Sequence, residues 1–327
     1  MKQWLLIFAL LGQVALAGST NGSISVDPTL PTYLPAAEVT GELVFSGPDT
    51  MEGVGRLWIA EFNKLQPKSK ISYFGKMVTP VDRSALGPNT DEVFANTSAP
   101  YGEKYLYEPF FVQVAMGSYN TPHQVQAVGV YVNAANPLDR ITLTQLDAIY
   151  SRERRRGHPN GITTWGDLGL TGEWEDQPIR IYGRTLRDEV AWHFKHVVMF
   201  DGAFRTGYVQ PGKGTSVDII DRLGNDPYGI AYSGFTYQTD MVKALALAGP
   251  DGVYVSGSNE TIANGTYPLS RPLYLYVNRV PGRPLSLLTR EFLLFVLSKR
   301  GQELVMENKA YLPMPADLVT RERAKLE

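Results

Sequence analysis

The sequence of 327 residues contains no cysteine, and this absence excludes two features at once. Disulfide bonds cannot form, so the apolar cores alone have to stabilise the fold. A lipoprotein anchor is also excluded, because its attachment requires a cysteine at the cleavage point. The charge is nearly balanced, and the formal net charge of −2 gives no strong attraction to nucleic acid or to membranes.

Sequence signatures of hydrolytic enzymes are absent as well. The chain has neither a Gly-x-Ser-x-Gly nor a His-Glu-x-x-His pattern. His193 and His196 have helical spacing without a third ligand, and we interpret them as packing or surface residues. The run from Gly207 to Gly214 nearly matches a nucleotide-binding loop, but Gly214 stands where that loop needs a hydroxyl. We therefore expect a protein that is not an enzyme and needs no metal or other cofactor.

Long apolar runs are scarce, and the one that stands out opens the chain. Lys2, the apolar stretch Trp4–Leu11 and the small residues Ala15–Ala17 form the three parts of a secretory signal. The stretch is too short to anchor a protein in a bilayer, and no later one reaches membrane length. We expect residues 1–17 to be removed as a signal peptide, and the mature chain to be periplasmic or secreted, without stable membrane insertion.

One pattern occurs twice, roughly 145 residues apart. Val130–Asn133 and Tyr274–Asn278 each read as a strand, followed by a Pro turn and an amphipathic helix. The echo either arises by chance or marks two similar α/β lobes. We interpret residues 18–126 with 270–327 as lobe I and residues 127–269 as lobe II, joined by two hinge crossings. A ligand would then bind between the lobes, at the strand ends.

Apolar spacing predicts further elements of the fold. Glu42–Ser46 reads as a strand, and a helix follows to about Leu65, with an apolar face of Met51, Val54, Trp58, Phe62 and Leu65. A single C-terminal helix is expected over about Thr289–Asn308. Residues 18–40, rich in Ser, Pro and Gly, are expected to form a loose entry segment.

Three strand-to-helix turns are candidates for anion binding, because helix N-termini present free N–H groups and a positive dipole end. At the first turn, Ser46 or Asp49 would cap the helix and Thr50 would offer its amide and hydroxyl to an anion. The alternative is simple capping. The third turn, Gln210–Ser216, is interpreted as a capped helix start, with Val217, Ile220 and Leu223 on the helix face.

The second turn runs from Ile181 to Glu189 and carries Arg184, whose guanidinium fits an oxyanion with two parallel hydrogen bonds. The alternative is that Arg184 pairs with a surface carboxylate. The expected helix face consists of Leu186, Val190, Phe194 and Val197. A basic loop of Arg152, Arg154, Arg155 and Arg156 is expected to be solvated, with docking to a membrane permease as the alternative.

Several motifs together resemble the phosphate-binding-protein-like branch of bacterial solute receptors for ABC importers. They include Ser46–Met51, Gly117–Pro122, Thr163–Gly169, Gly229–Gly234 and Tyr267–Arg271, and the resemblance extends from about Leu43 to the C-terminus. It implies a two-lobed type II periplasmic binding fold, a Venus flytrap with two hinge crossings.

The resemblance also implies ligand residues. Asp49 and Thr50 occupy the first binding loop, Arg184 matches the family arginine, and Ser118 lies in a turn that either adds polar ligand groups or serves only as a hinge turn. Two family motifs are changed. Gly75–Thr79 replaces a Gly-Ser-Ser-Thr loop, and Asp188–Val190 replaces Ser-Gly-Thr, which places two carboxylates where a dianion would bind.

The sequence therefore predicts an exported receptor that captures a small oxyanion, phosphate by resemblance, for an ABC permease. The altered motifs keep an alternative open. In that alternative the chain is a secreted interaction or structural protein with a degenerate anion pocket on the same fold. Binding of phosphate, tested against sulfate, phosphonates and sugars, separates the two.

Overall fold

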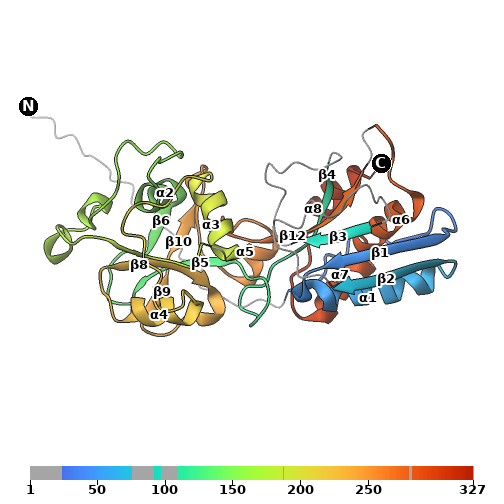
Figure 1. Cartoon of the computed structure of the whole chain (residues 1–327), viewed down its shortest axis with the longest axis horizontal. Helices are drawn as coiled ribbons and strands as arrows, with labels where there is room; N and C mark the ends of the chain where they lie inside the picture. The colour runs from blue at the N-terminus through green and yellow to red at the C-terminus, as the bar shows by residue number, and fades with distance from the viewer. Residues whose placement is uncertain (1–23, 76–91, 97–108, 187, 280–281, 327) are drawn as a thin grey trace, which may run out of the picture.

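The structure is a computed structural model that describes residues 24–75, 92–96, 109–186, 188–279 and 282–326. Figure 1 shows two lobes placed side by side along the long axis of the molecule. The expected signal peptide, residues 76–79 of the expected second binding loop, and Arg187 lie outside the described residues. Among the described residues, no helix combines the length and apolarity needed to span a bilayer.

The first lobe contains a five-stranded mixed sheet. Its strands β1 and β2 are parallel, β3 is parallel to β1, and β12 runs antiparallel to both of its neighbours, β3 and β4. In spatial order the strands are β2 (Ser69–Gly75), β1 (Gly41–Gly47), β3 (Glu92–Asn96), β12 (Pro272–Asn278) and β4 (Pro109–Met116).

In the part of the chain that the structure describes, this lobe contains the helices α1 (Asp49–Leu65), α6 (Leu287–Val296), α7 (Lys299–Asn308) and α8 (Ala316–Ala324). Helix α1 has its predicted extent and buries Met51, Val54, Trp58 and Phe62. The prediction for Leu65 was wrong, since it is 43% exposed in the last turn, where the helix runs out past the core. The indole of Trp58 donates to the carbonyl of Gly301 over 2.9 Å, which joins α1 to α7.

The expected single C-terminal helix is two helices. Ser298 interrupts it, because its hydroxyl accepts from the amide of Gly301 over 3.2 Å and thereby caps a new helix, α7. Only glycine fits at 301, since a Cβ there would lie 2.2 Å from the carbonyl oxygen of Val296. The break turns the chain so that both α6 and α7 pack against α1.

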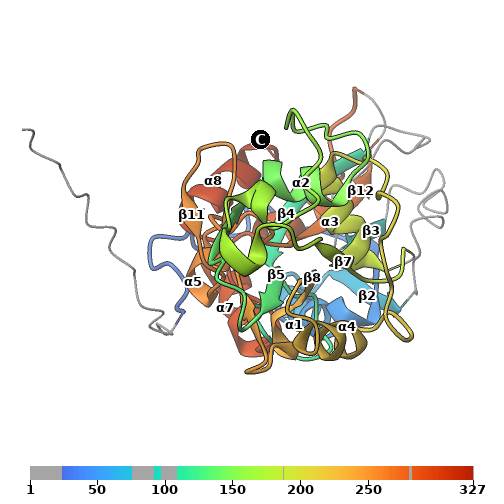
Figure 2. The ribbon, with the colours of Figure 1, turned by 90° about the vertical axis from the view of Figure 1, so that its left-hand side faces the viewer.

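The second lobe is built on a four-stranded sheet with a smaller sheet beside it. Helix α4 covers one face of the larger sheet, and α2 and α3 cover the other (Figures 1 and 2). The larger sheet has the order β7 (Arg180–Tyr182), β8 (Gly229–Gly234), β5 (Val128–Asn133), β9 (Val242–Ala244), and the smaller β11 (Tyr254–Val255), β10 (Ala246–Ala248), β6 (Arg140–Thr142). The helices are α2 (Leu143–Tyr150), α3 (Glu189–Met199), α4 (Ser216–Gly224) and α5 (Asn259–Ala263).

The two expected helix faces in this lobe were partly wrong. Asp188 caps α3 by accepting from the amide of Val190 over 2.8 Å, so the helix starts after Leu186, which is 51% exposed. In α4, Val217 is exposed while Ile220 and Leu223 are buried. The predicted capped start of α4 is confirmed, because Thr215 and Asp218 form a capping box.

The repeated sequence pattern corresponds to equivalent strands in the two sheets. β5 and β12 each run antiparallel to both sheet neighbours, and each is the first strand that the chain forms after crossing between lobes. An amphipathic helix follows each strand as predicted, α2 after β5 and α6 after β12. In the second lobe the short strand β6 comes between them.

The two crossings lie against each other and are hydrogen-bonded. The amide of Gly117 donates to the carbonyl of Arg271 over 2.8 Å. The amide of Val128 donates to the carbonyl of Leu269 over 3.0 Å. A Cβ at Gly117 would lie 2.9 Å from the carbonyl oxygens of both Arg271 and Val125, so this close approach requires glycine. The lobe boundaries at 126/127 and 269/270 stay predictions.

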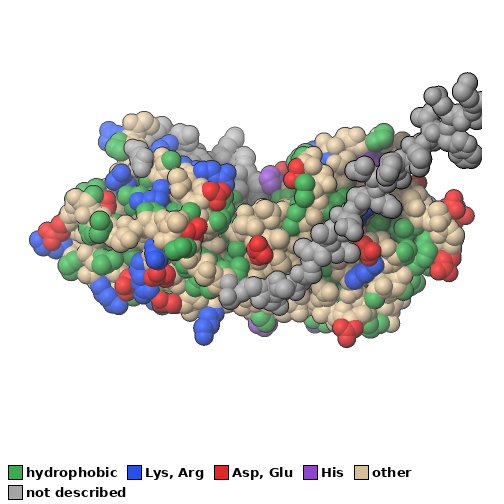
Figure 3. Space-filling model, turned by 180° about the vertical axis from the view of Figure 1, so that it is seen from behind, with side chains coloured by type: hydrophobic (Ala, Val, Ile, Leu, Met, Phe, Trp, Pro, Cys, Tyr) green, Lys and Arg blue, Asp and Glu red, His purple; other side chains and the backbone are tan. Residues whose placement is uncertain are grey.

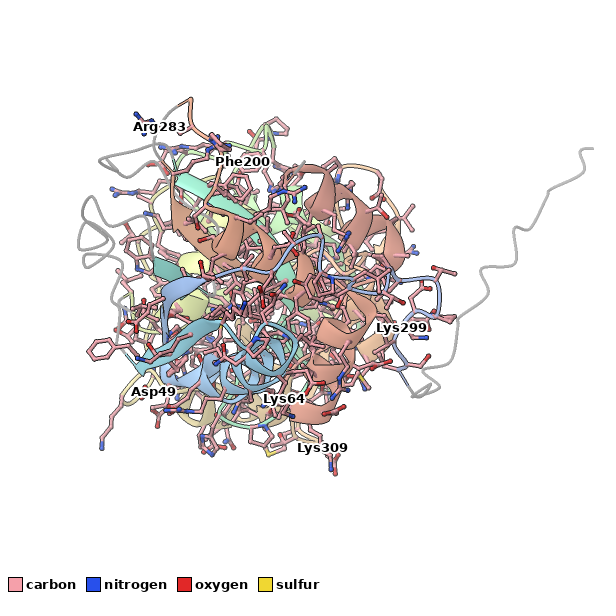
Figure 4. The ribbon with its side chains drawn as sticks, turned by 90° about the vertical axis from the view of Figure 1, so that its right-hand side faces the viewer. Asp49, Lys64, Phe200, Arg283, Lys299 and Lys309 are labelled. Carbon is pink, nitrogen blue, oxygen red and sulfur yellow. The ribbon has the colours of Figure 1, made fainter. Side chains whose placement is uncertain are left out.

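The described part of the expected loose segment, residues 24–40, is packed rather than loose. Leu30 and Val39 are buried, and the hydroxyl of Tyr33 donates to Glu291 over 2.8 Å. The carbonyl of Pro31 accepts from the amide of Lys299, at the start of α7 (Figure 4). The composition misled the prediction, because a few apolar anchors suffice to fix a Pro-rich segment onto a core.

Candidate anion-binding site

The first turn of α1 forms the part of the candidate site that comes from the first lobe. Pro48 is the N-cap residue, and no side chain of the described residues caps the helix, so the expected capping by Ser46 or Asp49 was wrong. Ser46 is buried at the end of β1, and Asp49 is exposed at the helix start (Figure 4). No side-chain cap therefore occupies the amides of this turn, which leaves them available to an anion, while Asp49 and Glu52 place negative charge in the same turn.

The hydroxyl of Tyr311 holds this turn in place. Its hydroxyl donates to the carbonyl of Thr50 over 2.7 Å and lies 3.1 Å from Oε1 of Gln124. Burial raises the pKa of Tyr311 to about 12, so the phenol stays protonated and keeps donating at physiological pH. Thr50 is half-buried, and its carbonyl is thus held by a residue that follows α7 in the chain.

Arg184 forms the part of the site that comes from the second lobe, directly after β7. The residue before it must be glycine, because a Cβ at Gly183 would lie 2.3 Å from the hydroxyl of Tyr208 and 2.5 Å from the ring of Tyr232. The Tyr208 hydroxyl donates to the carbonyl of Arg184 over 2.6 Å and lies 2.6 Å from that of Tyr232. The rings of Tyr208 and Tyr232 therefore form an aromatic floor that fixes the backbone of Arg184.

The guanidinium of Arg184 is held by groups of its own lobe. One nitrogen donates to the hydroxyl of Ser216 over 2.9 Å, and another donates to the carboxylate of Asp188. Both partners of the ion pair are mostly buried, with side-chain exposures of 17% and 20%. The expected alternative, a pair with a surface carboxylate, is only half right, because Arg184 does pair with a carboxylate, but this carboxylate is partly buried like the arginine.

Ser118 lies in the turn between β4 and β5 and is almost fully buried. Its hydroxyl accepts from the amide of Thr121 over 3.2 Å and lies 3.4 Å from the carbonyl of Val125. These bonds agree with the hinge-turn interpretation. A direct role of Ser118 as a ligand stays a prediction, and its hydroxyl would have to leave the turn to reach an anion.

Arg271 is a candidate site residue that the sequence reasoning quoted only as part of a motif. It ends the second crossing, just before β12, and donates to the carboxylate of Glu189 over 3.1 Å. Its side chain is 5% exposed, and within the described residues its buried Nε has no hydrogen-bond partner. The signal that could have identified Arg271 as a site residue was its position, because it is a charged residue at a predicted hinge crossing.

His193 lies on α3 beside the same crossing. Burial, with the nearby charge of Arg271 as a smaller cause, lowers the pKa of His193 to about 3. The imidazole is therefore neutral at physiological pH and leaves Arg271 as the charged group at this point of the hinge. His196 instead lies 3.0 Å from Asp201. Within the described residues, no group of three or more possible ligands could hold a metal ion.

These pieces connect the two lobes through the hinge. As effects much smaller than burial, the charge of Arg271 lowers the pKa of Tyr311 and that of Glu189 raises it, so this ion pair lies near the tyrosine that holds Thr50. Asp188, next to Glu189 in the chain, holds Arg184. The uncapped start of α1 is thus linked to both arginines through Tyr311, Glu189 and Asp188. Arginines and a free helix N-terminus suit an oxyanion, and two adjacent carboxylates already neutralise these arginines.

The basic loop after α2 was expected to be solvated, but two of its arginines bind backbone carbonyl groups. Arg155 donates to the carbonyl of Phe200 over 2.7 Å, and Arg156 donates to that of Val198 over 2.7 Å. Both arginines therefore neutralise the C-terminal end of α3. On the face shown in Figure 3, acidic and basic side chains are interspersed rather than separated by sign.

Comparisons with known proteins show the family and the fold. A family model described as a PBP superfamily domain matches residues 35–300. The chain is 35% identical to the phosphate-binding protein PstS of Pseudomonas aeruginosa PAO1, over 98% of both chains. It is 26% identical to the phosphate-binding protein PstS of Staphylococcus saprophyticus, over 61% of this chain and 59% of that protein.

Two solved structures share the fold. One is an ABC-type phosphate transport receptor from Vibrio cholerae, with a TM-score of 0.56 and 18% identity, over 84% of this chain and 100% of that one. The other is PstS from Borrelia burgdorferi, with a TM-score of 0.58 and 16% identity, over 84% and 99%. At such identities they bear on the fold alone, and they confirm the predicted two-lobed type II periplasmic binding architecture.

Proposed function

Because the chain belongs to the PBP superfamily domain family, we propose that it is an extracytoplasmic receptor that binds phosphate for ABC-type uptake. The observation that carries this function is the similarity to a phosphate-binding protein, which spans nearly the whole of both chains. Such relatives bind and release their ligand without changing it, so this chain is a binding protein rather than an enzyme.

The proposed binding step is closure of the two lobes on the anion. The first lobe contributes the N-terminus of α1 with Thr50, and the second contributes Arg184. Asp49, exposed in the first turn of α1, would accept the proton of monohydrogen phosphate. This interaction would favour a protonated oxyanion over sulfate, which has no proton to donate.

The hinge in this proposal consists of the two hydrogen-bonded crossings. Residues 18–126 and 270–327 would move as lobe I, and residues 127–269 as lobe II. The bond between Gly117 and Arg271 supports this division, because it lies where the chain passes between the two sheets. The few residues of the crossings would absorb the backbone changes of closure.

Delivery to a membrane permease and cleavage of residues 1–17 complete the proposed pathway. Export is supported by the three-part signal pattern at the start of the sequence. An ABC permease is the partner that the similarity implies, because a binding protein of this family needs a membrane component to move its ligand inward.

One observation favours a second candidate function. Both arginines near the proposed site are bound by carboxylates of the chain itself, which supports a secreted protein with a degenerate pocket.

Calorimetry of the protein freed of bound ligand, titrated with phosphate and with sulfate, tests the main proposal. We expect saturable binding of phosphate at one site and little binding of sulfate. Absence of phosphate binding would favour the degenerate pocket.

A further inference from the structure

Asp188 and Glu189 are neighbours in the chain, and each binds a different arginine. Asp188 binds Arg184 inside the second lobe, and Glu189 binds Arg271 on the crossing. The two carboxylates thereby place the first turn of α3 between the two cations. Carboxylates next to a helix N-terminus are also favoured by the helix dipole, so this arrangement is stable in the absence of any ligand.

The two ion pairs differ in how firmly their carboxylates are held. Asp188 is mostly buried and also caps α3 through the amide of Val190, so it stabilises the start of the helix in addition to binding Arg184. The side chain of Glu189 is 52% exposed, whereas that of Arg271 is 5% exposed. The glutamate is therefore the member of the Arg271 pair that solvent reaches, so it is the one that a competing anion can displace while the arginine stays in place.

Arg271 would still need a counter-charge after such a turn. Its Nε is buried and has no hydrogen-bond partner within the described residues, so the guanidinium has donor capacity left. His193 beside it is neutral and offers no negative charge. An uncompensated buried cation is costly, and an oxyanion that enters between the lobes would restore the balance.

We propose that Glu189 is a built-in counter-ion of Arg271, that phosphate displaces it, and that Arg271 is thereby a second phosphate-binding cation beside Arg184. This inference rests on the proposed function and specifies what sets the affinity of the protein for phosphate. The carboxylate and the phosphate compete for the same guanidinium, so the affinity for phosphate reflects the difference between the two interactions.

The test is the variant Glu189→Gln, which keeps the shape and removes the charge. With inorganic phosphate as the probe, calorimetry should show a dissociation constant about tenfold lower than in the wild type, because a competing like charge is gone. Glu173→Gln is the matched control. It makes the same charge change on an exposed residue of the short 3-10 helix Gly172–Trp174 and should leave affinity unchanged.

A second variant separates competition for Arg271 from a structural effect. In an Arg271→Gln background, phosphate binding should be weaker by about 100-fold, and adding Glu189→Gln should then change it little, because its target is gone. Thermal unfolding of each variant checks that it folds. An equal gain from Glu189→Gln with and without Arg271 would contradict the inference.

The outcomes also separate this inference from the proposed function. Binding by the wild type without tightening in Glu189→Gln overturns the counter-ion role alone. Binding only in Glu189→Gln supports the counter-ion role and overturns phosphate uptake by the natural chain. Binding in neither overturns both.

Discussion

The two lobes contribute to the candidate site in different ways. The first lobe offers the backbone of a helix start, supported by a tyrosine hydroxyl at Thr50, and Arg271 at the end of its crossing. The second lobe offers a side chain, Arg184, on an aromatic floor and already bound to a carboxylate. A backbone site is available at once, whereas the arginine site has to be vacated before an anion binds. We therefore expect the second lobe to exert most of the control over affinity, because both carboxylates that hold the arginines, Asp188 and Glu189, belong to it.

The largest expected effect comes from removing the cation of the second lobe. Arg184→Ala should weaken phosphate binding by about 2–5 kcal/mol, because the loss removes a desolvated charge contact and leaves Asp188 unpaired. Isothermal calorimetry measures the change. Arg283→Ala, at an exposed position of the first lobe, is the control and should bind as the wild type does. An Arg184→Ala protein with undiminished affinity would place the site elsewhere.

The next effect concerns pH and the packing of α3 on the crossing. The pKa of His193 is about 3 in the folded state, against 6.5 as the ordinary value, so between these values the unfolded chain binds the extra proton. The contribution of the neutral His193 to stability is therefore complete above about pH 6.5 and is lost as the pH decreases. The loss is about 1.4 kcal/mol per pH unit, or about 2 kcal/mol at pH 5.

Urea unfolding at several pH values measures this slope. His193→Gln should remove the part of the slope between pH 6.5 and 5, while His196→Gln, on the same helix but partly exposed, should retain it. An unchanged slope in His193→Gln would show that the acid sensitivity arises from another part of the molecule.

The smallest effect is expected in the first lobe. Tyr311→Phe removes the hydroxyl that donates to Thr50, and should lower the free energy of unfolding by about 1 kcal/mol. Phosphate affinity should change far less than in Arg184→Ala, since the dipole of α1 is intact. Tyr254→Phe, on the exposed strand β11, is the control. Equal losses of affinity in Tyr311→Phe and Arg184→Ala would remove the proposed difference between the lobes.

The sequence was sufficient for features that depend on local spacing. Helix α1 follows from apolar residues at helical intervals, and the repeated pattern identified β5 and β12. The break between α6 and α7 was missed, because Ser298 and Gly301 act through a cap and a close backbone approach that periodicity does not report.

The site was harder to predict than the fold because its partners are distant in sequence. Arg184 was identified at its turn, but the burial of its pair with Asp188 depends on the surrounding fold. Arg271 and Glu189 are 82 residues apart, and only the folding of α3 against the crossing brings them together. Long-range ion pairs of this kind leave no signal in one sequence.

The central claim is that the two lobes close on phosphate about the paired crossings. Small-angle scattering of the ligand-free protein, repeated with saturating phosphate, tests it most directly. The account predicts a smaller radius of gyration with phosphate and no change with sulfate. Identical profiles with and without phosphate would contradict closure on this ligand.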